Sequence, residues 1–152
     1  MIVYWDASAI VKRYVSEPGS AEIQALTGEA QANGSSVLSR AEVTATFKKA
    51  VRIGKLDEKS GKPLLCRFNR DWNDLVRIRV TNPLIRHAGT LAWNHDLRGY
   101  DAMHLASAAA WQQALGHEVT VATFDLALWQ AAGQIGLAAC PPDLPALLKS
   151  WH

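Results

Sequence analysis

The hydrophobic positions along this chain fall into two patterns, short apolar runs and longer stretches with helical spacing. The short runs predict β-strands at residues 2–5, 35–39, 76–80, 119–122 and 137–140. The longer stretches predict helices at residues 7–15, 21–32, 40–53, 57–75, 83–94, 99–114 and 126–132, with a brief tail helix after Pro142. Because strands and helices alternate throughout, we expect an α/β fold of three layers, in which helices cover both faces of a central parallel sheet.

Turn and cap residues set the boundaries of several of these elements. The pair Asn33-Gly34 is expected to end the second helix, because both residue types favour helix ends and turns. Ser39 and Glu42 have the spacing of a capping box, which predicts that together they start the third helix. Strict alternation at 76–80 predicts an edge strand with one exposed face, in which the inward positions are Val76, Ile78 and Val80.

Length and composition limit the class of protein. The 152 residues are enough for one domain, and 49% hydrophobic with 20% charged residues is typical of a folded globular protein. We find no signal peptide and no apolar stretch long enough to cross a membrane. Cys66 and Cys140 lack the spacing of metal ligands, so we expect two reduced thiols in the core of a cytoplasmic protein.

Charge is distributed unevenly, although the formal net charge is only +2. Residues 40–86 contain 12 Lys and Arg against 5 Asp and Glu, a net charge of +7, whereas the rest of the chain has a net charge of −5. A basic surface beside acidic residues suits a protein that cuts nucleic acid, with cations holding phosphates and carboxylates holding a metal ion. Solvated Lys and Arg on exposed helix faces would produce the same distribution.

The first predicted strand is followed at once by an acid, Asp6, and then by a helix. Open α/β sheets bind their ligands at the carboxyl ends of their strands, so Asp6 is a candidate site residue. Aspartate is also one of the preferred residues at the start of a helix. Position alone therefore leaves both roles open for Asp6.

Four acids occupy comparable positions: Asp6 and Asp125 follow predicted strands, Glu42 lies in the first helical turn after the second strand, and Asp101 lies in the first turns of the helix at 99–114. The carboxyl ends of parallel strands share one edge of the sheet, so these carboxylates can converge, although each alone can equally cap a helix or complement its dipole. Two carboxylates about 4 Å apart repel by about 4 kcal/mol at an effective dielectric of about 20, and a bound divalent cation would offset that repulsion. An all-oxygen ligand set selects Mg²⁺ or Mn²⁺ over Zn²⁺.

Four stretches of sequence surround or accompany these acids. They read VYWDASAIVK at 3–12, EPGS at 17–20, LRGYDAMHLA at 97–106 and ATFD at 122–125. In this order and at these separations they resemble the successive motifs of PIN-domain proteins, and specifically of the VapC-type ribonuclease toxins. The resemblance implies a single PIN domain over residues 1–152, with its core at about 1–140 and a short C-terminal tail at 141–152.

The resemblance also assigns roles to individual residues. Asp6, Glu42, Asp101 and Asp125 fall on the family's acidic positions, which implies that they are catalytic and hold the metal ion. Ser8 and Thr123 fall on hydroxyl positions that support the first acid. Lys12 and Arg98 fall on frequently basic positions, which suits phosphate contact, although a solvated cation or an ion pair with a nearby acid is an equally open reading. The stretch around Glu42 is the family's loosest motif.

Two further polar residues lie near the third acid. Asp96 competes with Asp101 for the acidic position, but it lies outside the motif, and we interpret it as a loop or helix-start acid. His104 is three residues past Asp101 and can share its helix face. The resemblance places a histidine here without a ligand role, and hard oxygen donors suit the expected ion, so we expect a supporting polar contact.

These inferences lead to one hypothesis and two alternatives. The hypothesis is a Mg²⁺- or Mn²⁺-dependent endoribonuclease, the toxin of a toxin–antitoxin module, that cleaves RNA through metal-activated water. The resemblance implies 5′-phosphate and 3′-hydroxyl products, a cognate antitoxin protein and a homodimer. One alternative is a catalytically idle PIN module that only binds a protein or RNA partner. The other is a Mg²⁺-dependent phosphatase-like domain, whose usual pattern wants a second Asp where this chain has Ser8.

Overall fold

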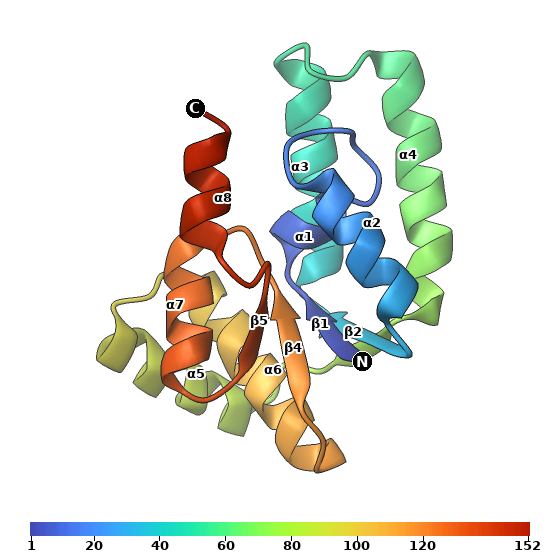
Figure 1. The fold of residues 1–152 in the computed structure, drawn as a ribbon. Helices are drawn as coiled ribbons and strands as arrows, with labels where there is room; N and C mark the ends of the chain where they lie inside the picture. The colour runs from blue at the N-terminus through green and yellow to red at the C-terminus, as the bar shows by residue number, and fades with distance from the viewer.

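The strands of this chain form one five-stranded parallel sheet in the order β3-β2-β1-β4-β5, in a computed structural model that describes all of residues 1–152 (Figure 1). The strands are β1 (Ile2–Trp5), β2 (Ala32–Ser36), β3 (Val76–Ile78), β4 (Val119–Ala122) and β5 (Ala138–Cys140). The helices are α1 (Ala7–Val11), α2 (Ser20–Glu29), α3 (Ser39–Arg52), α4 (Glu58–Asp71), the 3-10 turn η1 (Trp72–Asp74), α5 (Asn82–His95), α6 (Gly99–Leu115), α7 (Leu126–Gln134) and α8 (Leu144–Ser150).

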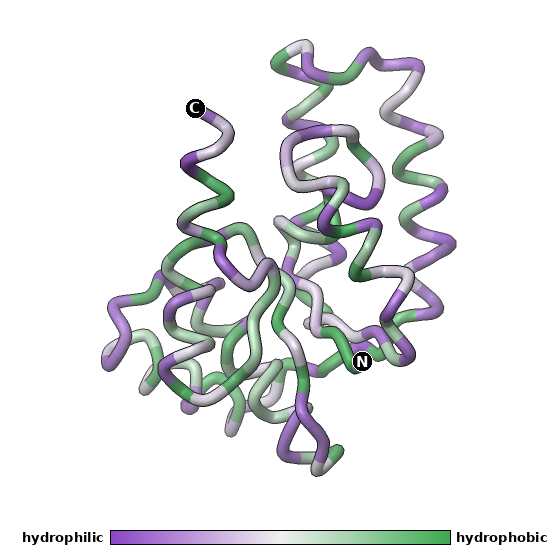
Figure 2. The backbone as a smooth tube through the Cα atoms, in the orientation of Figure 1, coloured by the Kyte–Doolittle hydropathy of each residue, from purple (hydrophilic) through white to green (hydrophobic).

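The central strand β1 divides the hydrophobic core into two halves, because successive side chains of a strand point to opposite faces. Tyr4 packs with residues of α5, α6 and α7 on one face, and Val3 and Trp5 pack with residues of α1 to α4 on the other. Figure 2 shows hydrophobic stretches along the strands and along the helices that flank them. Helices therefore cover both faces of the sheet, and the expected three-layer α/β fold is confirmed.

Strand β2 differs from the prediction for its part of the chain. It runs from Ala32 to Ser36 instead of 35–39, and Asn33-Gly34, expected to end a helix, lies inside it. The ring of Trp111 on α6 covers Gly34 so closely that a Cβ there would lie 2.7 Å from it. Trp5 donates a hydrogen bond of 2.8 Å from Nε1 to Oδ1 of Asn33. These tertiary contacts specify a polar strand that the hydrophobic pattern does not reveal.

The predicted capping box is also wrong. Helix α3 begins after Leu38, and no side chain caps its first turn. The Ser39 hydroxyl lies 2.7 Å from the hydroxyl of Ser35 on β2, and Glu42 bonds instead to His104 on α6. Both residues are therefore drawn into contacts between elements, which compete with the local pairing that their spacing suggests.

Most other boundaries agree with the prediction to within a few residues, but one boundary and the burial of two residues differ. Helix α1 ends at Val11 rather than at 15, and turns follow it. Strand β3 is an edge strand as expected, but Val76, expected to face inward, is 48% exposed. Cys66 and Cys140 are both free thiols, but Cys66 is exposed rather than in the core.

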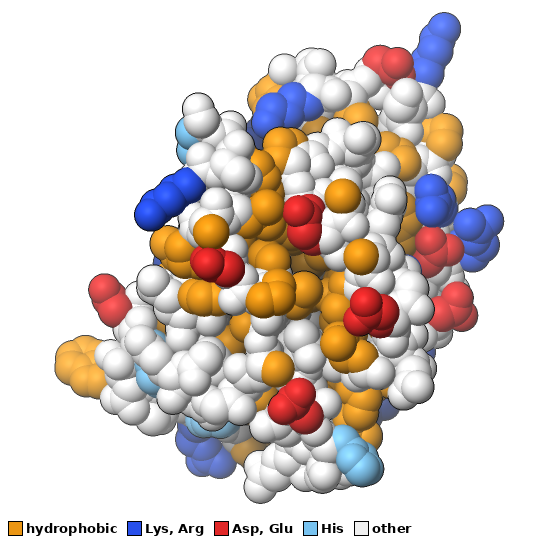
Figure 3. Space-filling view, viewed as in Figure 1, with side chains coloured by type: hydrophobic (Ala, Val, Ile, Leu, Met, Phe, Trp, Pro, Cys, Tyr) orange, Lys and Arg blue, Asp and Glu red, His pale blue; other side chains and the backbone are white.

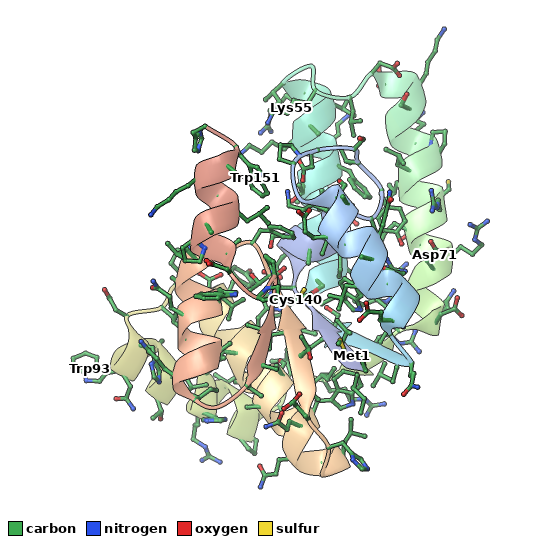
Figure 4. All side chains as sticks on the ribbon, in the orientation of Figure 1. Met1, Lys55, Asp71, Trp93, Cys140 and Trp151 are labelled. Carbon is green, nitrogen blue, oxygen red and sulfur yellow. The ribbon has the colours of Figure 1, made fainter.

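Helix α6 lies close against the sheet and against α5. Half of its buried positions are small residues, which allow backbones to approach closely: Ala102, Ala106, Ser107 and Ala108. Trp93 at the end of α5, by contrast, projects into solvent and is 89% exposed (Figure 4). None of the helices combines the length and the apolar character that a membrane crossing requires.

Candidate active site

The predicted acids lie around one cleft at the carboxyl ends of β1 and β4, a cleft of about 380 Å³. Asp6 follows β1, Asp125 precedes α7, and Glu42 and Asp101 lie in the first turns of α3 and α6. The lining includes all four acids together with other residues singled out from the sequence: Ser8, Lys12, Arg98 and His104. Residues from distant parts of the chain therefore meet where a parallel sheet is expected to gather them.

Asp6 is buried at the base of the cleft and is held by several hydrogen bonds. Its Oδ1 accepts from the Ser8 hydroxyl at 2.7 Å and from the Ala9 backbone N–H at 2.8 Å, and its Oδ2 accepts from the Thr123 hydroxyl at 2.6 Å. Asp6 is thus both the cap of α1 and a cleft residue, so the two roles that the sequence left open coexist. Burial raises the pKa of the Asp6 carboxyl, although the charge of His104 and these hydrogen bonds act in the opposite direction.

Thr123 connects Asp6 to the segment that carries Asp125. While its hydroxyl donates to Asp6, the same oxygen accepts from the backbone N–H of Asp125 at 3.0 Å. The Ser8 hydroxyl likewise accepts from the backbone N–H of Phe124 at 3.0 Å. Both hydroxyl residues therefore fasten the loop after β4 to the acid after β1.

Asp101 and Asp125 share one cation, the guanidinium of Arg98. Arg98 donates from Nε to Oδ2 of Asp101 at 2.8 Å and from a terminal nitrogen to Oδ2 of Asp125 at 2.9 Å. The other oxygen of Asp125 accepts from the Leu128 N–H and caps α7. The Arg98 side chain is 78% exposed, so this pair of bonds forms the solvent-facing side of the cleft.

The buried side chain of His104 contacts the Glu42 carboxylate from the interior of the protein. Nε2 of His104 lies 2.8 Å from Oε1 of Glu42, and Nδ1 lies 2.8 Å from the hydroxyl of Tyr4. Burial lowers the pKa of His104, but its bond to Glu42 and the nearby charges of Asp6, Glu42 and Asp101 outweigh that effect and raise it. The sequence does not single out Tyr4 as a site residue, because a tyrosine within an apolar strand indicates only a core position.

Lys12 is engaged within the protein rather than free at the cleft. Its ammonium group donates to Glu17 Oε1 and to the carbonyl of Pro18, both at 2.8 Å. It also lies 4.7 Å from the centre of the Phe124 ring and 5.4 Å from that of Trp151, which extends from the end of α8 (Figure 4). Lys12 therefore forms the ion pair that the sequence left open beside phosphate contact.

The donor groups of the cleft fit a hard divalent cation. The acids offer carboxylate oxygens, which are the ligands that Mg²⁺ and Mn²⁺ favour. Arg98 already occupies the position of a cation between two of them, and its bonds show that Asp101 and Asp125 can share positive charge. In this conformation no three acids, histidines or cysteines surround a single point as a complete metal site would. The ligand set would therefore close only when the side chains shift.

Comparison with known proteins agrees with the fold and with the motifs. The profile of the PIN domain family matches residues 3–133. Ribonuclease VapC45 of Mycobacterium tuberculosis (strain CDC 1551 / Oshkosh) is 38% identical over 148 residues, which cover 94% of this chain and 97% of that protein. Ribonuclease VapC46 of M. tuberculosis (strain ATCC 25618 / H37Rv) is 33% identical over 142 residues, which cover 93% and 98%.

Solved structures share the same fold at lower sequence identity. FitAcB from Neisseria gonorrhoeae superposes with a TM-score of 0.65 at 18% identity, over 93% of this chain and 98% of that chain. A toxin-antitoxin complex from Klebsiella pneumoniae superposes with a TM-score of 0.62 at 16% identity, over 93% and 98%. The sequence profile, the relatives and the parallel sheet with its acidic edge agree, and the chain belongs to the PIN domain family as a relative of the VapC ribonucleases.

Proposed function

We propose that this chain is a metal-dependent endoribonuclease, the toxin of a toxin–antitoxin pair, which hydrolyses RNA phosphodiester bonds in the acidic cleft. The observation that carries the proposal is the meeting of Asp6, Glu42, Asp101 and Asp125 from four separate segments in one cleft. A protein that used these acids only as helix caps would have no reason to bring them together against their mutual repulsion. The ribonuclease names of its relatives support the same reaction class.

The residues of the cleft would have different roles in hydrolysis. Asp6, Glu42, Asp101 and Asp125 would hold Mg²⁺ or Mn²⁺, while Ser8 and Thr123 keep Asp6 oriented. The bound ion would activate water and stabilise the charge that develops on the phosphate. Arg98 is the exposed cation next to the acids, and it would pair with phosphate oxygens when Asp101 and Asp125 are engaged with the ion.

Basic residues outside the cleft are suited to hold the RNA backbone. In Figure 3 Lys and Arg side chains project from the end of the molecule that α3 and α4 form, where Lys55 connects the two helices (Figure 4). Contacts of this kind weaken as salt rises, because binding releases counterions from the nucleic acid. We further propose a single PIN domain over residues 1–152, a homodimer, and a small cognate antitoxin protein as the inhibitory partner.

An RNA cleavage assay tests the proposal. The purified protein, freed of any partner, is incubated with structured RNAs in Mg²⁺, Mn²⁺ or EDTA, and the fragment ends are analysed. We expect internal cleavage with either ion and none in EDTA. Asp101→Asn should lower the rate by about 100-fold or more, since a metal ion contributes several kcal/mol to such reactions.

A matched acid outside the cleft provides the control. Asp143 caps α8 by accepting from the Ala146 N–H, and it lies apart from the cleft lining. Asp143→Asn should therefore retain the wild-type rate. RNA binding without cleavage in any metal ion would contradict the proposal and favour the idle binding module.

A further inference from the structure

We infer that His104 is a positioning residue for Glu42, anchored through Tyr4 to the sheet, and that it sets the direction in which the Glu42 carboxylate faces the cleft. The inference rests on the proposed function in one respect, which is that Glu42 holds the metal ion. It assigns to His104 a role distinct from metal coordination.

A continuous chain of hydrogen bonds carries this inference. The backbone N–H of Ser36 on β2 donates to the Tyr4 hydroxyl at 3.2 Å, the hydroxyl lies 2.8 Å from His104 Nδ1, and His104 Nε2 lies 2.8 Å from Glu42. Tyr4 is fully buried and His104 is 2% exposed. The chain thus runs from the backbone of the sheet to a carboxylate at the edge of the cleft.

When the His104 ring is neutral, donors and acceptors along this chain have one consistent arrangement, and in the protonated ring Nδ1 donates to the Tyr4 hydroxyl instead. A carboxylate only accepts, so His104 must donate from Nε2 to Glu42. The Tyr4 hydroxyl accepts from Ser36, which leaves its own proton free to donate to Nδ1 of the neutral ring. Both ring nitrogens are therefore occupied, and neither is left for a metal ion.

Glu42 needs such an anchor more than Asp6 and Asp125 do. Asp6 is held by Ser8, Thr123 and a backbone N–H, and Asp125 is held by the start of α7. Glu42 has a longer side chain, and its carboxylate makes one bond within the protein, the bond to His104. Fixing a flexible carboxylate before metal binding reduces the entropy lost on binding, and partners of this kind typically contribute 10- to 100-fold to metal affinity or activity.

Two substitutions of His104 test the contacts of its two ring nitrogens separately. His104→Asn keeps a polar group near Nδ1 for Tyr4 but loses the reach to Glu42, whereas His104→Gln keeps a donor near Nε2 for Glu42. Mn²⁺ affinity is measured by calorimetry, alongside RNA cleavage. We expect His104→Asn to weaken Mn²⁺ binding by about 10-fold or more, and His104→Gln to restore much of the affinity.

A double-mutant cycle distinguishes positioning from a general structural role. If His104 acts through Glu42, adding His104→Asn to Glu42→Gln should change Mn²⁺ affinity little further. His95→Asn is the matched control, because His95 bonds to Gln134 outside the cleft lining, and it should leave affinity unchanged. Equal losses from His104→Asn in both backgrounds would overturn the inference.

The outcomes also separate this inference from the proposed function. If the wild-type protein binds Mn²⁺ and cleaves RNA while His104→Asn does so equally well, the inference fails and the proposed function stands. If the wild-type protein shows neither property, the proposed function fails and the inference fails with it. Should His104→Asn not fold, Tyr4→Phe removes the anchor with a smaller change, and unaltered Mn²⁺ affinity in that variant would overturn the inference.

Discussion

The two sides of the acidic cleft are built in different ways. On the buried side, Asp6 lies at the end of the central strand and is 4% exposed, and side-chain hydroxyls and a backbone N–H hold its carboxylate. On the exposed side, Asp101 and Asp125 are joined by the guanidinium of Arg98, a long and largely exposed side chain. Hydrogen bonds from the sheet and its loops thus fix the buried side, whereas the exposed side chain of Arg98 holds the exposed side.

This difference indicates how the two sides of the cleft would respond to the proposed metal ion. Neutral donors on the buried side orient Asp6 without adding positive charge, so its negative charge remains available to a cation. On the exposed side Arg98 supplies the positive charge that two close carboxylates need. An exposed ion pair exchanges easily because water competes with it, so Arg98 can be displaced at low cost.

The largest effect on folding stability is expected on the buried side. Thr123→Val removes a hydroxyl that is fully buried and leaves both the Asp6 carboxylate and the Asp125 N–H without that partner. The loss should be about 2 kcal/mol in the free energy of unfolding, or a Tm lower by roughly 4 to 8 °C. Thr90→Val, at an exposed threonine on α5, should stay within about 0.5 kcal/mol of wild type. A similar small change in Thr123→Val would show that the buried side is not rigid.

A smaller loss of stability, together with a gain in metal affinity, is expected when the exposed cation Arg98 is removed. Arg98→Gln should lower the Tm of the metal-free protein slightly, since Asp101 and Asp125 then repel each other, and should raise Mn²⁺ affinity several-fold because no side chain competes for their oxygens. Calorimetric titration with Mn²⁺ measures the affinity, and Arg86→Gln on α5 serves as the control. Weaker Mn²⁺ binding in Arg98→Gln would mean that Arg98 organises the acids for the ion rather than competing with it.

The subtlest effect is the pH dependence of the metal-free protein. Burial raises the pKa of Asp6 above its usual value of 3.8, so in this range the folded state binds more protons than the unfolded state. Stability should therefore fall as pH rises from about 4 through the raised pKa of Asp6. His104, whose pKa is raised above 6.5, also loses its stabilising contribution as pH rises, in a higher range.

Urea denaturation in EDTA at a series of pH values separates these two contributions. Asp6→Asn should lose the decline that begins near pH 4, since the amide does not titrate, and should reduce the decline at higher pH without removing it, because Asp6 is only one of the groups that raise the pKa of His104. Identical pH profiles for Asp6→Asn and wild type would show that burial does not control this carboxyl.

The arrangement of the fold could be predicted from the sequence wherever apolar residues mark the buried positions. The run at 2–5 predicted the fully covered strand β1, and the small residues after Gly99 predicted a helix packed closely on its neighbours. The position of strand β2 was not predicted, because its sequence Ala-Asn-Gly-Ser-Ser has no hydrophobic pattern. Its place in the sheet depends on Trp111 covering Gly34 and on Trp5 bonding Asn33, contacts between residues far apart in the chain.

The same division applies to the site. The chain order of the motifs sufficed to nominate the four acids, the two hydroxyl residues that hold Asp6, and the two cations, because motif residues are local in sequence. Apart from the two hydroxyls that support Asp6, the partners of the side chains were not predictable, and Glu42 illustrates why. Its spacing from Ser39 predicted a local cap, yet the structure pairs it with His104 on another helix.

The sequence by itself determined most of the elements and nominated the residues that we propose carry the chemistry, because periodicity and motif spacing are properties of neighbours along the chain. Tertiary structure alone decided that Arg98 lies between two acids, that Lys12 is bound to Glu17, and that Tyr4 and His104 reach Glu42 from the core. Hydrogen bonds and ion pairs act over about 3 Å, and only the folded chain brings such groups within that distance.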